Sequence, residues 1–257
     1  MFVADLTFDC YQDTQLDTAE QAINQMVVAL RANGQIIGDE FPTVLKDGYF
    51  LTRIMCPEED SLHPLNHSPF VKFAINKLNE AGLLAPKVKI VGQDIHANSA
   101  DNCHEPSSYI LYTTYLHTCS PLYCGDDFLP VPLYKIPAIA NGDYKTLIKW
   151  QEDWQACDQL QINGATKAEF AALDELCLLD SSLTRRGLDL SKRIRFLTKK
   201  PVYYYLYRVG GESLAQEKLR PCPSCGGDWL LDEPWFGLFD FKCDACELVS
   251  NISWDHQ

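Results

Sequence analysis

The sequence predicts a mixed α+β fold in three parts. The apolar residues of 1–95 follow the order β-α-β-β-α-β, which is typical of a ferredoxin-like sandwich. Within 96–210, two extended segments give way after Asp143 to the period of helices, which predicts a layer of three helices. Residues 211–257 contain two Cys-x-x-Cys pairs separated by 17 residues, a spacing typical of a small metal-bound ribbon. These three parts are the predicted domains.

The first strand and helix follow from alternation and capping signals. Residues 3–8 alternate apolar and polar side chains, as a half-buried strand does. Thr18 and Gln21 have the spacing of a capping box, and the apolar residues that follow fall on one helical face. Gly34 stands where a left-handed residue ends a helix. We therefore expect a helix that starts at Thr18 and ends before Gly34.

The remaining elements of the N-terminal part are two strands, a helix and a closing strand. The strands are expected at 35–38 and 49–55, on either side of a polar turn. Ser68 followed by proline is a strong signal for the start of a helix, which Gly82 ends. A strand at 87–91 completes the sandwich.

The middle part begins with a polar loop over 96–106 and continues with extended segments at 108–116 and 129–136. Prolines at 130 and 132 predict that the second segment lies on a sheet edge. Three helices follow, and then a strand at 202–207. The apolar faces of the helices are defined by Leu147, Trp150, Trp154 and Cys157, by Phe170, Leu173 and Cys177, and by Leu183, Leu190, Ile194 and Leu197.

The two cysteine pairs predict a metal site. Two thiolates in one tight turn reach the same ion, and the glycines after the first pair allow the positive φ that lets amides point at the sulfurs. Four thiolates leave no open coordination position, which indicates one structural Zn²⁺ in a zinc ribbon rather than a catalytic metal. Redox or chance pairs are the alternative. The predicted ligands are Cys222, Cys225, Cys243 and Cys246.

The net charge of −13 is distributed unevenly. Residues 211–257 contain three basic and nine acidic side chains, so the predicted ribbon is acidic before its thiolates are counted. Clustered Lys and Arg dominate affinity for a phosphate backbone, so this charge disfavours nucleic-acid binding by the ribbon. The one basic stretch is an amphipathic helix whose cations form either a solvated, internally paired face or a nucleic-acid-binding surface: Arg185, Arg186, Lys192, Arg193, Arg195, Lys199 and Lys200.

The predicted ribbon also carries many aromatic side chains among its acids. Aromatic residues left exposed beside carboxylates would form an anchor with an acidic rim, a composition that suits binding to a basic protein. Packing on the helical layer is the alternative use of the same rings. The candidate partner surface is Asp228, Trp229, Asp232, Glu233, Trp235 and Asp240.

No catalytic motif is found in the sequence. It contains no nucleophile elbow, phosphate-binding glycine loop or His-Glu-x-x-His, and paired acids at 58–60 and 126–127 are typical of solvated loops. We therefore expect a protein that is not an enzyme. A second metal site is the alternative to ordinary thiols for four residues whose spacing matches no ribbon or finger: Cys103, His104, Cys119 and Cys124.

The first residues lack a basic region followed by an apolar stretch, and no apolar run approaches the roughly 18 residues that span a bilayer. We expect a cytoplasmic protein without membrane contact. In that setting, the 11 cysteines serve as thiols and metal ligands rather than as disulfides.

Several phrases of the sequence together resemble a known family. They are Ser120-Pro-Leu-Tyr-Cys-Gly125, Pro132-Leu-Tyr-Lys-Ile-Pro137, Leu183-Thr-Arg-Arg-Gly187 and the run from Thr198 to Arg208, followed by the ribbon. Over roughly its full length the chain is similar to a proteobacterial family of zinc-ribbon-containing proteins of unknown function, for which nucleic-acid binding is suggested. The resemblance implies zinc at the four ribbon cysteines. It also implies that some relatives are immunity proteins to antibacterial nuclease toxins.

Two functions from different classes follow. The first is an acidic immunity or inhibitor protein that binds and blocks a basic, nuclease-type toxin, because an acidic surface accelerates association with a basic cleft and discriminates among partners. The second is a nucleic-acid-binding zinc-ribbon protein that uses the helix over 185–200, with ribbon aromatics stacked on bases. A toxin gene beside this one would favour the first.

Overall fold

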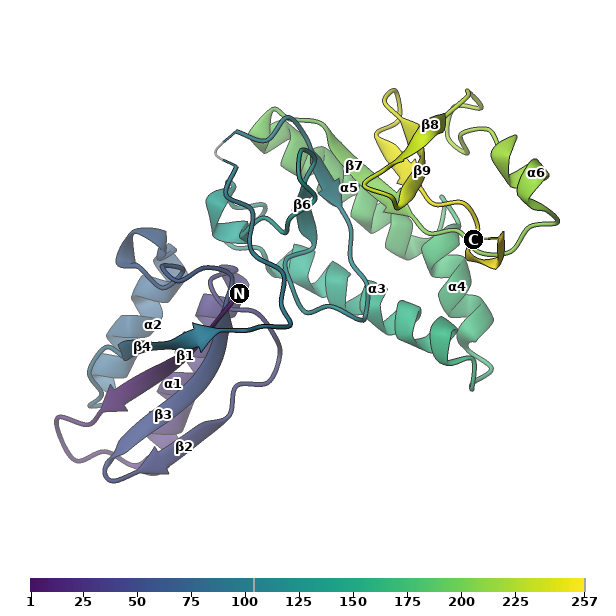
Figure 1. Cartoon of the computed structure of the whole chain (residues 1–257). Coiled ribbons are helices and arrows are strands. Elements are labelled where there is room, and N and C mark those ends of the chain that lie inside the picture. The colour runs from purple at the N-terminus through teal and green to yellow at the C-terminus, as the bar shows by residue number, and fades with distance from the viewer. Residues whose placement is uncertain (104, 257) are drawn as a thin grey trace. The chain divides into compact units, whose positions relative to one another are not determined.

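The computed structural model describes residues 1–103 and 105–256, which form a mixed α+β structure (Figure 1). The chain divides into two compact units. Unit 1 comprises residues 1–100, 118–120 and 129–146, and unit 2 comprises 101–117, 121–128 and the chain from 147 onward. Residues 129–146, which the sequence places in the middle part, therefore belong to unit 1.

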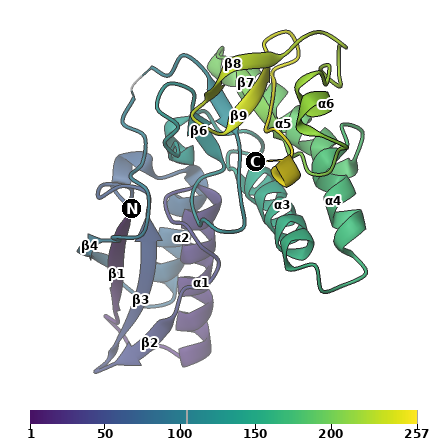
Figure 2. The ribbon, with the colours of Figure 1, turned by 45° about the vertical axis from the view of Figure 1, so that its right-hand side comes forward.

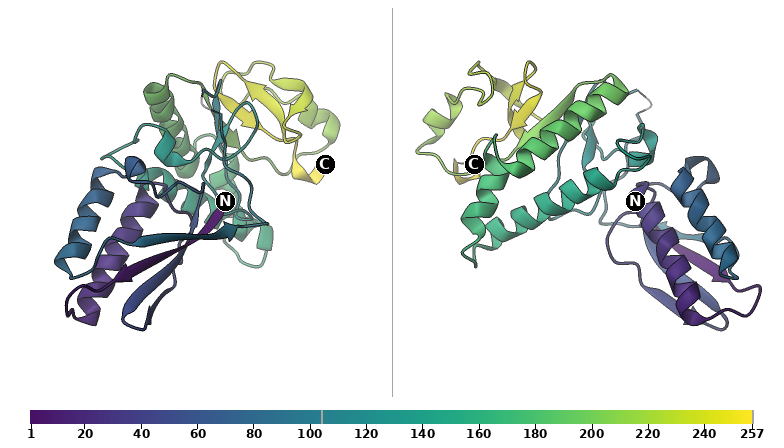
Figure 3. Two further views of the ribbon diagram at one scale, coloured as in Figure 1. Left: turned by 60° about the vertical axis from the view of Figure 1, so that its left-hand side comes forward. Right: turned by 180° about the vertical axis from the view of Figure 1, so that it is seen from behind.

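Unit 1 is a four-stranded antiparallel sheet with two helices on one face (Figure 3). The strands lie in the order β2-β3-β1-β4, so the first strand is central and the two β-α-β connections interleave. Both the element order and the strand order agree with the ferredoxin-like pattern. The elements are β1 (Phe2–Asp9), α1 (Leu16–Ala32), β2 (Thr43–Lys46), β3 (Tyr49–Cys56), the short helix η1 (Pro64–Asn66), α2 (Pro69–Glu80) and β4 (Lys87–Gln93).

The core of unit 1 lies between the sheet and the helices. Alternate residues of β1, such as Leu6 and Phe8, are buried against apolar residues of α1 and α2. The predicted cap of α2 is confirmed, because the Ser68 hydroxyl accepts a hydrogen bond from the Val71 backbone N–H at 3.3 Å. The predicted start of α1 at Thr18 is wrong: the helix begins two residues earlier, after Gln15, whose side chain makes no capping hydrogen bond.

The expected strand at 35–38 is replaced by a single bridge between Ile37 and Met55, and β2 lies at Thr43–Lys46 instead. The turn explains the shift. Asp47 and Gly48 both have positive φ, at 48° and 84°, and so form a two-residue hairpin turn that pairs the strands directly on either side of it.

The open face of the sheet carries an exposed ion pair that should make a small, pH-dependent contribution to stability. The Arg53 guanidinium donates hydrogen bonds to Asp5 at 2.8 and 3.0 Å, and this lowers the pKa of Asp5 below its usual value of 3.8. A carboxylate with a lowered pKa stabilises the fold above its unfolded-state pKa, and this stabilisation is lost as pH falls through the folded-state pKa. Asp5→Asn should lower the melting temperature by at most a few degrees at pH 7. In thermal melts the difference from wild type should shrink below about pH 4, and a difference that grows with acid would contradict this account.

Unit 2 is built on a six-stranded sheet in the order β6-β5-β7-β10-β9-β8, with β7 parallel to both of its neighbours (Figure 2). Its strands are β5 (Tyr109–Leu111), β6 (Leu122–Cys124), β7 (Val202–Leu206), β8 (Leu230–Trp235), β9 (Phe239–Cys243) and β10 (Leu248–Ser250). The helices of this part of the chain are α3 (Lys145–Asn163), α4 (Glu169–Cys177), α5 (Ser182–Thr198), α6 (Leu214–Lys218) and the short η3 (Trp254–His256). The cysteine-bearing C-terminal segment thus completes this sheet rather than folding beside it.

Helices α3 and α5 cover one face of the sheet (Figure 3) and bury large aromatic residues against β7. Trp150 packs edge-on against Tyr204, and its indole N–H donates to the Leu183 carbonyl at 3.2 Å. All three predicted helices are present. The predicted face of α4 is wrong in part, because Phe170 is 72% exposed and the helix buries Ala172 and Leu176 instead.

The expected strand at 129–136 is also absent. In its place are irregular backbone and the short helix η2 (Leu133–Lys135), because Pro130 and Pro132 cannot donate hydrogen bonds to a strand ladder. Tyr134 instead donates a hydrogen bond to Glu58 at 2.6 Å and lies 3.0 Å from the hydroxyl of Ser61. These contacts hold the segment on unit 1.

Candidate metal centre

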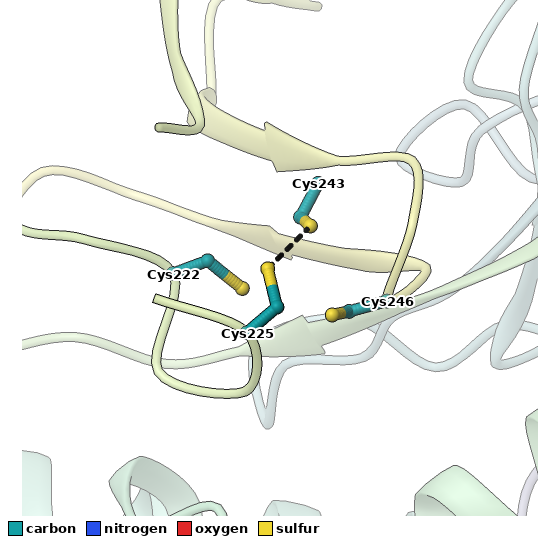
Figure 4. A group of neighbouring side chains, drawn as sticks. All are labelled: Cys222, Cys225, Cys243 and Cys246. Atoms are coloured by element: carbon teal, nitrogen blue, oxygen red, sulfur yellow. Dashed lines mark hydrogen bonds between the residues drawn. The ribbon is translucent and has the colours of Figure 1, made fainter. Parts of the chain in front are cut away.

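The four predicted ligands meet in one cluster, which we call the four-cysteine centre. Cys222 and Cys225 lie on the turn before β8, and Cys243 and Cys246 lie at the turn between β9 and β10, with their side chains converging (Figure 4). The four sulfurs lie within 4.8 Å of one another, and the Sγ atoms of Cys225 and Cys243 are 3.7 Å apart. A tetrahedral ion with bonds of about 2.3 Å places its sulfurs about 3.8 Å apart. The donor set and its spacing therefore fit a metal ion.

The backbone conformation of both cysteine-bearing turns is suited to holding a metal ion. The Gly226 N–H donates to the Cys222 carbonyl at 2.8 Å, and Gly226 has a φ of 72° that glycine adopts without strain. In the second turn Glu247 follows Cys246 as Gly226 follows Cys225, and it also has a positive φ, of 52°. The same Glu247 forms an ion pair with Arg195 of α5 at 3.0 Å. The second turn is thus held to the helical layer by a side chain.

The sulfurs differ in their readiness to ionise. Hydrogen bonding from the Gly227 backbone, together with the neighbouring thiols, lowers the pKa of Cys225 to about 7. Burial raises the pKa of Cys243 to about 12. A bound cation would have to displace the proton from Cys243, so metal binding here should release protons and strengthen as pH rises.

Two aromatic residues beside the centre, Trp229 and Phe241, pack against the half-buried side chain of Arg220. Trp229 is 3% exposed, and its indole N–H donates to the Arg220 carbonyl at 2.9 Å. The Arg220 guanidinium lies 4.8 Å from the Trp229 ring and 4.4 Å from the Phe241 ring. Trp229 is therefore part of the interior and does not form the exposed anchor considered from the sequence.

An ion cluster around the buried carboxylate of Glu217, next to these two aromatic residues, was not anticipated from the sequence. The Glu217 carboxylate accepts hydrogen bonds from Arg208 Nε at 3.0 and 3.1 Å and lies 3.7 Å from Arg220 Nε. Burial alone would raise the pKa of Glu217, but the hydrogen bonds and charges of the two arginines outweigh it and lower that pKa. Glu217 and Arg220 are only three residues apart, a local spacing, whereas Arg208 and Glu217 are nine residues apart and no sequence pattern joins them.

The acidic candidates differ in exposure. Asp228, Asp232 and Glu233 are exposed, and no ion pair to any of them occurs in the described structure. Asp240 is half-buried and accepts a hydrogen bond from the Ile252 backbone at 2.6 Å. Trp235 is half-buried, with the Lys242 ammonium 4.8 Å from its ring. Three acids therefore remain available to a partner.

The basic helix is α5, and its cations are largely exposed. Three of them meet carboxylates. Arg186 pairs with Asp153 at 2.6 Å, Lys192 with Asp189 at 3.5 Å, and Arg195 with Glu247 as described above. The other cations of the predicted set are Arg185, Arg193, Lys199 and Lys200. Some of the basic side chains of α5 thus form ion pairs with acidic side chains of the same chain.

The second candidate metal site was expected to contain Cys103, His104, Cys119 and Cys124, but the structure brings together a different set of residues. Cys103 and Cys124 approach each other together with the carboxylate of Asp126, while Cys119 lies outside this group. His104 lies outside the described residues.

No helix in the described part of the chain is both long and apolar enough to cross a membrane.

Three models of protein families match consecutive parts of the chain. Residues 1–92 match a domain of unknown function, DUF8589; residues 103–207 match DUF2310; and residues 211–256 match DUF8594, both also domains of unknown function. The molecule is therefore a mixed α+β protein of three recurrent sequence modules, with the four-cysteine centre built into its second sheet.

Two proteins of Haemophilus influenzae, each described as uncharacterized, are close relatives. One is 43% identical over 249 residues, which cover 95% of this chain and 94% of the relative, and the other is 46% identical over 179 residues, which cover 69% and 87%. The chain belongs to the family that these two proteins represent. A solved structure assigned as an antibiotic biosynthesis monooxygenase, from Deinococcus radiodurans, matches 39% of this chain and all of its own at 17% identity and a TM-score of 0.28, too low to support an argument.

Proposed function

We propose that the four-cysteine centre holds one structural Zn²⁺ and that the C-terminal segment is a zinc ribbon. Four sulfur donors at tetrahedral spacing support zinc, and a structural role is supported because these donors would fill all four positions of the ion. The ion would join the turn before β8 to the turn before β10. It would thereby fix the part of unit 2 that carries the three exposed acids.

We further propose that the protein is a non-enzymatic binding protein of the cytoplasm that blocks a basic partner, in the manner of an immunity protein against a nuclease toxin. The observation that supports this most directly is the exposure of Asp228, Asp232 and Glu233 on the ribbon without ion-pair partners in the described residues. Carboxylates left unpaired on a chain of net charge −13 attract a basic protein and steer its approach. Covering the basic cleft of a nuclease would deny that cleft to nucleic acid.

The test begins with the tagged full-length chain in its native bacterium. We expect co-purification of a protein with a basic nuclease domain, whose cleavage of DNA or RNA is blocked at one-to-one stoichiometry by the added chain. Asp232→Lys combined with Glu233→Lys should weaken that complex at least tenfold in titration calorimetry, because like charges across an interface oppose association. Asp189→Lys is the matched control, since this exposed acid lies on α5 and should have little effect.

Nucleic-acid binding through α5 is the second candidate, and one observation favours it. Phe196 is 62% exposed, and the Lys199 ammonium lies 4.1 Å from the centre of its ring, with the Arg193 guanidinium at 5.7 Å. An exposed ring between cations is a platform on which a base can stack while its phosphate is neutralised.

Titration with single- and double-stranded DNA and RNA separates the two candidates. The binding-protein proposal predicts no measurable binding at physiological salt. Micromolar, salt-sensitive binding that Phe196→Ala and Lys199→Glu each abolish would favour the second candidate, particularly if only nucleic acid co-purifies with the native chain.

A further inference from the structure

A second group of metal-ligating side chains lies at the end of β6, in unit 2 and outside the four-cysteine centre. The Sγ atoms of Cys103 and Cys124 and a carboxylate oxygen of Asp126 lie within 4.8 Å of one another. Asp101 and Asp127 form a second group of the same size around the same Cys124. One further thiol, that of Cys103, and three carboxylates thus lie around the buried sulfur of Cys124.

The backbone of this site is fixed by close packing. The Gly125 N–H donates to the Ser108 carbonyl at 2.9 Å, and a Cβ at Gly125 would lie 3.0 Å from that same oxygen and still nearer the Ser108 hydroxyl. Glycine is therefore required for the turn after β6 to reach the start of β5. Asp126 secures the turn further by accepting a hydrogen bond from the Ser107 backbone N–H at 2.7 Å.

The turn at Cys124 directs backbone amides at the sulfur, as the turn at Cys225 does, although burial raises the pKa of the Cys124 thiol as it raises that of Cys243. The side chain of Cys124 is buried, and it accepts a hydrogen bond from the Asp126 backbone N–H at 3.4 Å, with the Asp127 N–H also directed at it. Cys225 of the four-cysteine centre receives the Gly227 N–H in the same relation, two residues on. In both turns a glycine follows the cysteine directly. Amides that point at sulfur stabilise a thiolate, the form in which cysteine binds metals, and a bound cation would displace the proton that burial keeps on Cys124.

We propose that Cys103, Cys124 and Asp126 bind a second Zn²⁺ ion. Two sulfurs with a carboxylate oxygen suit zinc, whereas Mg²⁺ and Ca²⁺ prefer sites made of oxygen alone. Asp101 and Asp127 add negative charge close to the ion. Cys103 and Asp126 are exposed, and three donors fill only three positions of a tetrahedral ion. The second zinc is therefore accessible to solvent and exchanges faster than the ion in the four-cysteine centre.

The test measures zinc in the full-length chain after saturation with the metal and removal of the excess. Cys103→Ser should hold one zinc fewer per chain than wild type, or bind its weaker zinc at least tenfold less tightly against a fluorescent chelator. Because Cys103 is exposed, the variant should fold as wild type does. Cys10→Ser, at an exposed cysteine of unit 1, is the control and should match wild type in zinc content.

Cobalt substitution supplies a second readout. Co²⁺ in wild type should show sulfur-to-metal absorption from two kinds of site, and Cys103→Ser should lose only the part contributed by the site with fewer thiolates. Equal zinc content and equal cobalt spectra in wild type and Cys103→Ser would overturn the proposal. So would a Cys103–Cys124 disulfide in protein purified under reducing conditions, because oxidised sulfurs cannot bind the ion.

Discussion

Replacing Cys225 by serine should remove the proposed zinc from the C-terminal segment and lower the melting temperature by roughly 10 °C. Structural zinc contributes about 10–16 kcal/mol to the folding of small zinc domains, so losing one of four ligands should cost several kcal/mol. The Cys225 side chain is exposed, and serine there removes little packing. A large fall in the melting temperature must therefore come from the loss of the ion. Thermal melting followed by circular dichroism, with elemental analysis of the same samples, measures both quantities.

Cys10→Ser is the control for this substitution, because Cys10 is also exposed and lies in unit 1. It should leave metal content and melting temperature near their wild-type values. If Cys225→Ser retains its zinc, or loses it without loss of stability, the four-cysteine centre does not hold the fold together as we infer.

Gly187→Ala should destabilise unit 2 by about 3 kcal/mol, which corresponds to a fall of roughly 6–12 °C in melting temperature. Gly187 lies on α5 where the helix crosses β7, and an added Cβ would overlap the Tyr204 ring and stand 2.8 Å from the indole nitrogen of Trp150. Alanine favours a helix over glycine by about 1 kcal/mol, so the steric cost must exceed that gain. The two aromatic rings cannot both move away, since each is almost fully buried.

Gly92→Ala is the matched control for the steric argument. A Cβ at Gly92 would meet no atom within 4 Å, and its stability should change by less than about 1 kcal/mol. Thermal melts of the two variants should therefore differ by several degrees. A wild-type melting temperature for Gly187→Ala would mean that α5 and β7 are packed less closely than the structure shows.

Local signals predicted well those features that depend on a few neighbouring residues. The Ser68 cap, the positive φ of Gly34 and the convergence of the four cysteines all follow from short-range chemistry, and all are present. The periods of apolar residues likewise predicted the element order β-α-β-β-α-β of unit 1, apart from the position of β2. In each case the residues that determine the feature are adjacent in sequence or belong to one repeated pattern.

Features set by contacts distant in sequence could not be predicted. The Gln35 side chain, expected in a strand, is instead buried, and its amide donates to the Ser61 carbonyl at 2.7 Å. The position of β2 is a different case, because the Asp47–Gly48 dipeptide is a short-range signal for a hairpin that pairs the residues on either side of it. The burial of Trp229 depends on Arg220, and nothing in the sequence distinguishes this arginine from a surface one. The composition gives the number of aromatic residues in this segment. It cannot show which ring is buried against the Arg220 guanidinium.

The place of β10 in the second sheet has a consequence for how the chain folds during synthesis. Strand β7 lies between β5, which precedes it, and β10, which a ribosome delivers more than 40 residues later. Until residues 248–250 emerge, one edge of the buried, aromatic β7 lacks its native neighbour, and such an edge readily pairs with other chains. Metal capture at the four-cysteine centre, whose last ligand lies two residues before β10, would then close that edge. Zinc supply during translation, and not only the stability of the finished protein, would decide how much of the chain escapes aggregation.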